Sequence, residues 1–257
     1  MNIDLTNRAA LVTGASSGLG RHFAGVLAGA GARVAVAARR RESMEEVVAE
    51  IAATGGQAVA VSLDVTDAAS VRDGVREAAS VLGGLDILVN NAGTTVSKSA
   101  LDHTEEDWDR VVDTNLKGAF LVAQEAARVM QERKAGRVMG GSIVNIASIL
   151  GLRVAGHVAA YAASKAALVQ LTQALALEWA RYGIRVNALA PGYIETDLNR
   201  DFFATDAGQA LIRRVPQRRL GHLSDLDGPL LLLCSDAAAY MTGAVVPVDG
   251  GHLVNTL

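Results

Sequence analysis

The chain has 257 residues, of which 50% are hydrophobic and 20% are charged, and its formal net charge is −3. These values exclude an intrinsically disordered chain and give no indication of a surface for nucleic acid or for an anionic membrane. One cysteine, Cys234, excludes an intrachain disulfide, and the five histidines have no metal-ligand spacing. Without a signal peptide or a long apolar run, we expect a soluble, cytoplasmic protein that holds no metal.

Short apolar runs alternate with longer amphipathic stretches along the whole chain. The apolar runs predict strands over residues 8–13, 33–38, 57–62, 85–90, 142–147, 184–190 and 244–248. The amphipathic stretches predict helices over residues 19–30, 43–53, 67–82, 105–134 and 161–181. Gly31 is expected to end the first helix, Ser43 with Glu46 to cap the second, and Asp67 to begin the third.

Strands that alternate with helices predict an α/β fold, a doubly wound seven-stranded parallel sheet with helices on both faces. The strand segments are apolar throughout, as expected when both faces of a sheet are covered. No linker, charge block or fixed-period repeat divides the chain, so residues 1–257 are interpreted as one domain. Residues 195–223 are polar, contain Phe202, Phe203 and several arginines, and are expected to form a substrate lid.

A glycine-rich turn, TGASSGLG at residues 13–20, joins the first strand to the first helix. Its glycine spacing differs from the common G-x-G-x-x-G pattern, but it allows the same tight turn and the same close approach to a pyrophosphate. The helix start would add unpaired N–H groups for the phosphates. The expected cofactor contacts are Gly14, Ser16, Ser17, Gly18, Leu19 and Gly20; the alternative is a glycine-rich turn without a ligand.

The end of the second strand indicates which nucleotide is bound. NAD-dependent enzymes place a carboxylate there for the ribose 2′-hydroxyl, whereas this chain reads Ala37-Ala38-Arg39-Arg40-Arg41. Arg39 is positioned for a 2′-phosphate, although a solvated arginine run is the alternative. The neutral Ser17 in the glycine turn argues the other way. We favour NADP(H), with NAD(H) as the other possibility.

The ends of the third and fourth strands carry further polar residues. Asp64, followed by Val65, is suited to accept a hydrogen bond from the adenine amino group, because Asp67 already fills the role of helix cap. Asn91, Ala92 and Gly93 follow the fourth strand, where a small turn would allow close approach to a ribose; an ordinary turn is the alternative.

Three residue types near the fifth strand point to proton transfer. Ser148 follows that strand, and Tyr161 and Lys165 lie four apart at the start of the next helix, on one helix face. An ammonium about 4 Å from a phenol would favour the phenolate by roughly 4 kcal/mol at an effective dielectric constant of about 20. We therefore expect Lys165 to lower the pKa of Tyr161, and Ser148 to donate to a substrate oxygen.

These motifs, taken in order, resemble the short-chain dehydrogenase/reductase family. The resemblance covers nearly the whole chain and adds DVT at 64–66, NNAG at 90–93, YAASK at 161–165 and TGAVVPVDGG at 242–251 to the glycine turn. It implies a Rossmann fold and a homotetramer in which the helices over 105–134 and 161–181 pair between subunits. It also implies a small-molecule carbonyl or alcohol substrate, with no nucleic acid or membrane as partner.

The resemblance implies a role for each matching residue. Tyr161 would be the acid/base, Lys165 would hold the nicotinamide ribose, Ser148 would polarise the carbonyl, and Asn115 would fix a water that relays protons toward Lys165. The nicotinamide end would be contacted by Pro191, Gly192, Ile194 and Thr196. A mostly apolar substrate pocket would be lined by Ser148, Leu150, Val154, Ala155, Tyr161 and Tyr193. Arg153 and His157, which fall between Ser148 and Tyr161, depart from the usual pattern.

Within the family, the stretches APGYIETDL at 190–198 and VPQRRLG at 215–221 are most similar to bacterial 3-oxoacyl-carrier-protein reductases. The expected activity is NADPH-dependent reduction of a ketone, either a 3-oxoacyl group or a small hydrophobic ketone. Two alternatives remain open: an NAD-dependent polyol or sugar-alcohol dehydrogenase, and a non-catalytic nucleotide-binding sensor. Arginines 213, 214, 218 and 219 form either a solvated helix face or a contact for phosphopantetheine or CoA.

Overall fold

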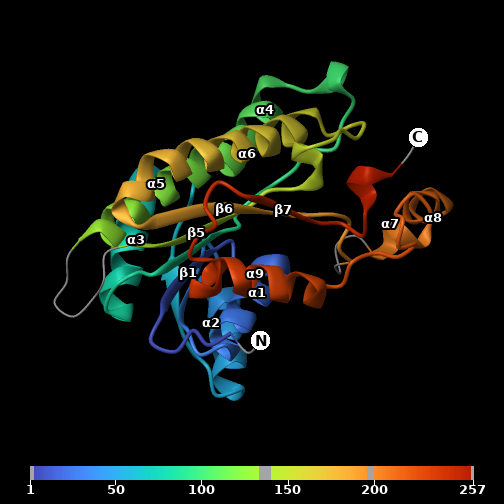
Figure 1. Ribbon diagram of the computed structural model, residues 1–257. Coiled ribbons are helices and arrows are strands. Elements are labelled where there is room, and N and C mark those ends of the chain that lie inside the picture. The colour runs from blue at the N-terminus through green and yellow to red at the C-terminus, as the bar shows by residue number, and fades with distance from the viewer. Residues whose placement is uncertain (1–2, 133–139, 196–199, 256–257) are drawn as a thin grey trace.

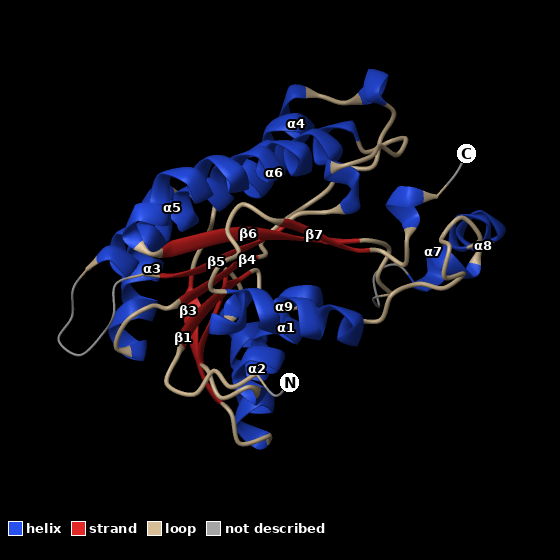
Figure 2. Ribbon diagram, viewed as in Figure 1, coloured by secondary structure: helices blue, strands red, loops and turns tan. Residues whose placement is uncertain are grey.

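The central feature of the computed structural model is a seven-stranded, wholly parallel sheet; the structure describes residues 3–132, 140–195 and 200–255 (Figures 1 and 2). Its strands are β1 (Ala9–Thr13), β2 (Arg33–Ala38), β3 (Gln57–Ser62), β4 (Ile87–Asn90), β5 (Gly141–Ile146), β6 (Ile184–Pro191) and β7 (Val245–Val248). The strand order is β3-β2-β1-β4-β5-β6-β7. The predicted doubly wound α/β fold is confirmed, and the order reverses between β1 and β4, where such sheets bind ligands.

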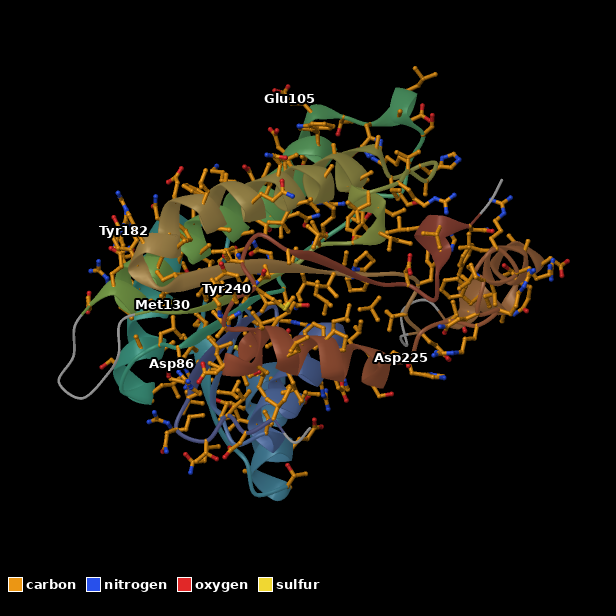
Figure 3. The ribbon with its side chains drawn as sticks, viewed as in Figure 1. Asp86, Glu105, Met130, Tyr182, Asp225 and Tyr240 are labelled. Carbon is orange, nitrogen blue, oxygen red and sulfur yellow. The ribbon has the colours of Figure 1, made fainter. Side chains whose placement is uncertain are left out.

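Helices cover both faces of the sheet. On one face lie α1 (Gly18–Gly29), α2 (Arg41–Ala53) and α9 (Asp227–Cys234); on the other lie α3 (Ala68–Leu82), α4 (Glu105–Val112), α5 (Ala119–Gln131) and α6 (Ala159–Trp179) (Figure 1). Two short helices, α7 (Arg200–Ala204) and α8 (Asp206–Ile212), lie beyond the end of β6 and β7. Side chains fill the space between the sheet and both helix layers (Figure 3).

The alternation of side chains along β1 divides the core into two layers. Ala10 and Val12 pack toward α1, α2 and α9, whereas Ala9 and Leu11 pack toward α3, α5 and α6. All four side chains are fully buried. Because both faces are covered, every residue of this strand is apolar or small except Thr13, which lies at its carboxyl end.

Of the two helix caps predicted from the sequence, Asp67 and Ser43, one is present in the structure. Asp67 caps α3 as predicted, since its Oδ1 accepts from the N–H groups of Ala69 (2.8 Å) and Ser70 (3.3 Å). The prediction that Ser43 caps the second helix is wrong: α2 begins at Arg41, so Ser43 lies inside the first turn. An ion pair between Arg41 and Glu45 (2.9 Å) supports this earlier start.

The long helix predicted over 105–134 is interrupted. A π-helical turn, Asp113–Gly118, separates α4 from α5, and α5 ends at Gln131. The turn carries Asn115, and at Gly118 a Cβ would come within 2.8 Å of the Val65 carbonyl oxygen. A wide turn of this kind is common at functional sites, and here it brings the helix close to the loop after β3.

The segment between β6 and α9 is closed at its base. Ile194 and Gly221 form a parallel bridge, in which Glu195 N donates to Gly221 O and Gly221 N donates to Tyr193 O, both at 2.9 Å. The segment therefore leaves the body of the domain and returns to it at one place, with α7 and α8 in between.

The described ranges contain neither a candidate membrane span nor a candidate metal site. Within residues 3–132, 140–195 and 200–255, no helix combines the length and apolar character needed to cross a bilayer. In the same ranges, no three His, Cys, Asp or Glu side chains group in a way that would hold a metal ion.

Candidate active site

The glycine turn between β1 and α1 is shaped by close packing. Gly14 has φ +63°, and a Cβ there would lie 2.8 Å from Ala92 Cα; at Gly20 it would lie 2.4 Å from Gly14 O. Gly18 has φ +55°, but a Cβ would meet no atom within 4 Å. Ser17, the residue before α1, makes no side-chain capping bond. The turn therefore leaves open space beside a helix start with no side-chain cap, which is an arrangement suited to a phosphate.

Thr13 joins the glycine turn to the loop after β4. Its Oγ1 accepts from Asn91 N (3.0 Å) and Ala92 N (3.1 Å), and Asn91 Nδ2 donates to Thr13 O (2.9 Å). This role of Thr13 was not predicted from the sequence. The one signal available was a polar residue that ends an otherwise apolar strand. Thr13 thus fixes the loop that carries Gly93.

The end of β2 brings two guanidinium groups to the cofactor side. The Arg39 side chain is 75% exposed and its Nη1 lies 4.0 Å from Asp64 Oδ2. Arg40 Nη2 lies 3.5 Å from Ser16 Oγ in the glycine turn. This strand end has no carboxylate, whereas NAD-dependent enzymes place one there. Arg40, which was not singled out from the sequence, is therefore a second candidate for phosphate recognition.

Asp64 is held in its own turn. Its Oδ1 accepts from Thr66 N (3.0 Å) and Thr66 Oγ1 (2.7 Å). Burial works to raise the pKa of this carboxyl, but the two Thr66 bonds and the Arg39 charge outweigh it, so the pKa lies below its ordinary value. Asp64 is therefore ionised near neutral pH. Val65, which follows it, is buried.

Ser148 and Tyr161 meet beyond the end of β5. Ser148 has an extended backbone, and its Oγ accepts from Leu150 N (3.1 Å) at the start of a short 3-10 turn. Tyr161 lies in the first turn of α6. Burial raises the pKa of the Tyr161 hydroxyl, and a hydrogen bond with the Ser148 side chain offsets only part of this rise. The expected lowering of this pKa by Lys165 is wrong for the protein on its own.

The position of the Lys165 ammonium explains that difference. Lys165 is only 4% exposed, and its Nζ donates to Ile146 O at 2.7 Å. The same Nζ lies 5.7 Å from the centre of the Tyr161 ring. The four-residue spacing does put both side chains on one helix face, but the ammonium is directed to the carboxyl end of β5. Burial lowers the pKa of Lys165 to about 8.

Asn115 connects three elements rather than making a local helix bond. Its Nδ2 donates to Thr94 O (2.9 Å) and Ser164 Oγ (3.1 Å), and its Oδ1 accepts from Thr94 N (2.7 Å). Gly93 lies beside it, because a Cβ there would be 3.4 Å from Asn115 Oδ1 and 3.7 Å from Lys165 Nζ. Asn115 thus positions the loop after β4 against α6, next to the buried lysine; its expected water relay stays a prediction.

The residues expected at the nicotinamide end follow β6. Pro191 is the last residue of that strand, and at Gly192 a Cβ would lie 2.7 Å from Asp249 Cα, so only a glycine fits. Ile194 is 6% exposed and belongs to the core. Thr196, the fourth residue expected here, lies outside the described residues.

The expected apolar substrate pocket is only partly apparent. Leu150 and Ala155 are half-buried, but Val154 is 83% exposed and forms no buried wall. The Tyr193 ring packs against Phe203 (5.9 Å between centroids) and His252 (5.3 Å). Tyr193 is thus tied to α7 and to the C-terminal segment, which the sequence did not associate with it.

Comparison with known proteins gives concordant matches. A family model described as "Enoyl-(Acyl carrier protein) reductase" matches residues 14–252. The 3-oxoacyl-[acyl-carrier-protein] reductase of Staphylococcus aureus (strain Mu50) is 40% identical over 245 residues, 95% of this chain and 97% of that protein. A structure from Sinorhizobium meliloti, provisionally named a short-chain alcohol dehydrogenase, is 47% identical with a TM-score of 0.93 over 100% of both chains. A structure from Agrobacterium tumefaciens, provisionally named a 2-deoxy-D-gluconate 3-dehydrogenase and containing NADP, is 41% identical with a TM-score of 0.90 over 99% of both.

Proposed function

The chain belongs to the short-chain dehydrogenase/reductase family, and from that premise we propose that it reduces a ketone to a secondary alcohol with NADPH. It is an oxidoreductase that acts on CH–OH and C=O groups with NAD(P). The observation that carries the proposal is the meeting of Ser148, Tyr161 and Lys165 at the carboxyl end of β5, beside the glycine turn.

The roles of these residues follow from their protonation. When bound, the nicotinamide supplies or accepts the hydride. A raised pKa keeps the Tyr161 hydroxyl protonated, so it can deliver a proton to a carbonyl oxygen, and Ser148 Oγ donates a hydrogen bond to that oxygen. Lys165 Nζ, with a pKa of about 8, can exchange a proton near neutral pH and restore the Tyr161 proton. Gly93 has no side chain beside Lys165, so the ribose would be able to approach the Lys165 ammonium there.

The residues of the glycine turn and of the β2 end fit a dinucleotide with a 2′-phosphate. Gly14 and Gly20 allow the turn to pack closely, Gly18 leaves open space at the start of α1, and two arginines stand where a carboxylate would repel that phosphate. The Agrobacterium relative contains NADP, which supports the same preference. NAD(H) remains the alternative, because Arg39 is largely exposed.

Two substrate classes are supported by different relatives. The Staphylococcus enzyme, named for its 3-oxoacyl substrate, supports reduction of a 3-oxoacyl group or a small hydrophobic ketone. The Agrobacterium protein supports a polyol or sugar-acid dehydrogenase as the second candidate. In either case, we propose that segment 195–223 covers the substrate, since its base at Ile194 and Gly221 lies next to Tyr193.

The proposed reaction can be tested by following NADPH oxidation by the purified protein. The carbonyl panel would contain a 3-oxoacyl thioester, small hydrophobic ketones and keto-sugars. We expect at least one to be reduced, and NADH at the same concentration to support a rate about tenfold lower. NADPH binding without oxidation by any member of the panel would favour the non-catalytic sensor instead.

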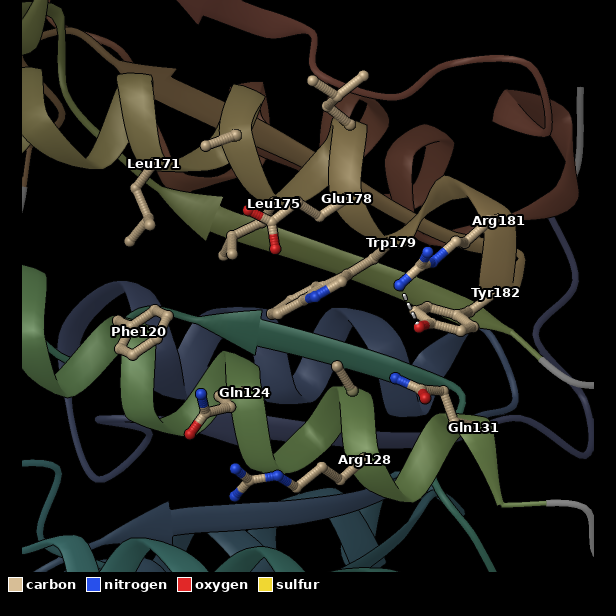
Figure 4. A pocket seen from close by; sticks show the side chains of 13 residues that line it. Phe120, Gln124, Arg128, Gln131, Leu171, Leu175, Glu178, Trp179, Arg181 and Tyr182 are labelled. Carbon is tan, nitrogen blue, oxygen red and sulfur yellow. Dashed lines mark hydrogen bonds between the residues drawn. The ribbon is translucent and has the colours of Figure 1, made fainter.

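We also propose the homotetramer that the family resemblance implies. A groove runs between α5 and α6, with Phe120, Leu171 and Trp179 along it (Figure 4). Arg128 on α5 and Glu178 on α6 lie at the same groove and offer opposite charges to a second copy. A two-fold axis would set these charges against each other, as a self-complementary interface requires.

A charge placed in this groove should break the assembly. Leu177 lines the groove and is 83% exposed, so Leu177→Glu should leave the fold intact but bury a carboxylate at the interface. Light scattering should then report a smaller oligomer than for the unaltered protein. Val81→Glu, at an exposed position on α3, is the matched control and should leave the mass unchanged. An unchanged mass for both variants would place the interface elsewhere.

A further inference from the structure

Arg153 is a cation with a defined position and, within the part of the chain that the structure describes, no acidic partner. It follows Ser148 in the loop between β5 and α6, and its Nη1 donates to the backbone oxygen of His252 at 2.5 Å. Among the described residues, no carboxylate forms an ion pair with it. Within the described ranges, one of the five guanidinium donors makes a side-chain hydrogen bond, and the others are available to a ligand.

A buried polar ring lies beside this guanidinium. His252 is 5% exposed, and within the described ranges its Nδ1 has no hydrogen-bond partner. Its ring packs edge to face with Tyr193, at 5.3 Å between centroids. Burial lowers the pKa of His252 and raises that of Tyr193. Both side chains are consequently neutral near pH 7 and offer hydrogen bonds rather than charge.

Two cations and one carboxylate act on these two rings. Arg153 and Arg214 act on both rings, and Asp249 acts on His252. Asp249 is occupied locally, since its two carboxylate oxygens accept from Gly251 N (2.9 Å) and Leu253 N (2.7 Å). An anion beside these rings would therefore meet two guanidinium groups and one carboxylate that is already hydrogen-bonded.

The cluster lies next to the residues of the proposed reaction. Tyr193 follows β6, the strand beside β5, and Arg153 comes from the loop that connects Ser148 to Tyr161. The C-terminal turn that carries His252 lies between this loop and helices α7 and α8 (Figure 1). A substrate whose carbonyl oxygen meets Ser148 and Tyr161 would extend toward Arg153.

We propose that Arg153 binds a carboxylate on the substrate, so that the enzyme acts on oxo acids and hydroxy acids. The inference rests on the proposed function for the position of the reacting carbon. A guanidinium fits a carboxylate because its planar donors can engage both oxygens. The neutral rings of Tyr193 and His252 shield that pair from water on one side. This assignment favours a small acid over an uncharged ketone.

The test compares acids with their primary amides, which have nearly the same shape and no charge. The pairs are acetoacetate with acetoacetamide and gluconate with gluconamide. Acetoacetate and its amide are titrated into protein saturated with NADP⁺, and the gluconate pair into protein saturated with NADPH, so that no hydride can pass. Calorimetry then gives affinities that do not depend on turnover. At least one acid should bind about tenfold more tightly than its amide.

The variant Arg153→Gln separates charge from structure, because a glutamine amide can still donate to His252 O. The variant should lower the affinity for the acid about tenfold and change the affinity for the amide less than about twofold. Arg72→Gln, at an exposed arginine on α3, is the control and should change neither. Equal affinity for acid and amide in the unaltered protein, or equal weakening of both in Arg153→Gln, would overturn the inference.

The two proposals fail in different ways. If acids bind preferentially through Arg153 but no carbonyl compound is turned over, the carboxylate site is supported and the proposed reaction is contradicted. If uncharged ketones are reduced and no acid is preferred in the binding titrations, the proposed reaction is supported and the carboxylate site is contradicted.

Discussion

The variant Tyr161→Phe should lose ketone reduction by about a thousandfold while it still binds NADPH. The phenol is hydrogen-bonded with Ser148 and can deliver a proton to the carbonyl oxygen, and its raised pKa keeps it protonated at neutral pH. Removing one oxygen from a partly buried ring leaves the packing against Val96 and Val111 intact. The loss should therefore fall on kcat and not on the stability of the fold.

The measurement is the rate of NADPH oxidation at saturating cofactor, with cofactor affinity taken from fluorescence transfer between the two tryptophans and the reduced nicotinamide. Tyr240→Phe is the matched control, since that side chain is fully exposed and its hydroxyl should not affect catalysis. Turnover in Tyr161→Phe close to that of the control would remove Tyr161 from the reaction.

The double variant Arg39→Ala/Arg40→Ala should lower the affinity for NADPH about tenfold or more and change the affinity for NADH little. Only NADPH carries the 2′-phosphate, so the lost charge-assisted hydrogen bonds affect one cofactor. Each single variant should show a smaller loss, because the Arg39 side chain is exposed and Arg40 reaches Ser16 only at 3.5 Å. The difference should shrink at high salt, where exposed charges are screened.

Titration with each cofactor in parallel gives the preference directly. Arg41→Ala is the control, because Arg41 is the next residue of the same run but pairs with Glu45 on its own helix. If the double variant keeps the original preference, the two arginines are surface charges. The reaction would then be better described as oxidation of an alcohol with NAD⁺.

Local signals in the sequence predicted the fold well. The β2 and β3 bounds agree fully with prediction, because each strand is a short apolar run that ends in a turn. Asp67 was predicted as a cap because its partners lie within three residues. The prediction that Ser43 caps the second helix was wrong because a serine within the first turn of a helix looks the same in the sequence as a serine that caps the helix. The π-helical turn within the predicted 105–134 helix was not predicted, because the close contact between this turn and the loop after β3 has no local signal in the sequence.

The candidate site was predictable as a set of residues but not as a geometry. Tyr161 and Lys165 share a helix face as their spacing predicts, yet the pKa of Tyr161 moves the other way because Lys165 bonds to the distant Ile146. Thr13 and Asn91 show the same limit, since their bonds join the ends of β1 and β4, which are separated by two other strands in sequence order but adjacent in the sheet. Contacts of this kind have no local signature.

The bridge between Ile194 and Gly221 makes the segment it encloses a candidate for exchange between relatives. Both ends of the segment meet at one pair of residues, so its length and contents can change with little effect on the sheet, because loop-closure entropy varies slowly with length. Gly221 is the constraint, since a Cβ there would lie 2.5 Å from Ile194 Cδ1. A chimera that keeps this pair and grafts another member's segment should inherit the donor's substrate range on an unaltered cofactor platform.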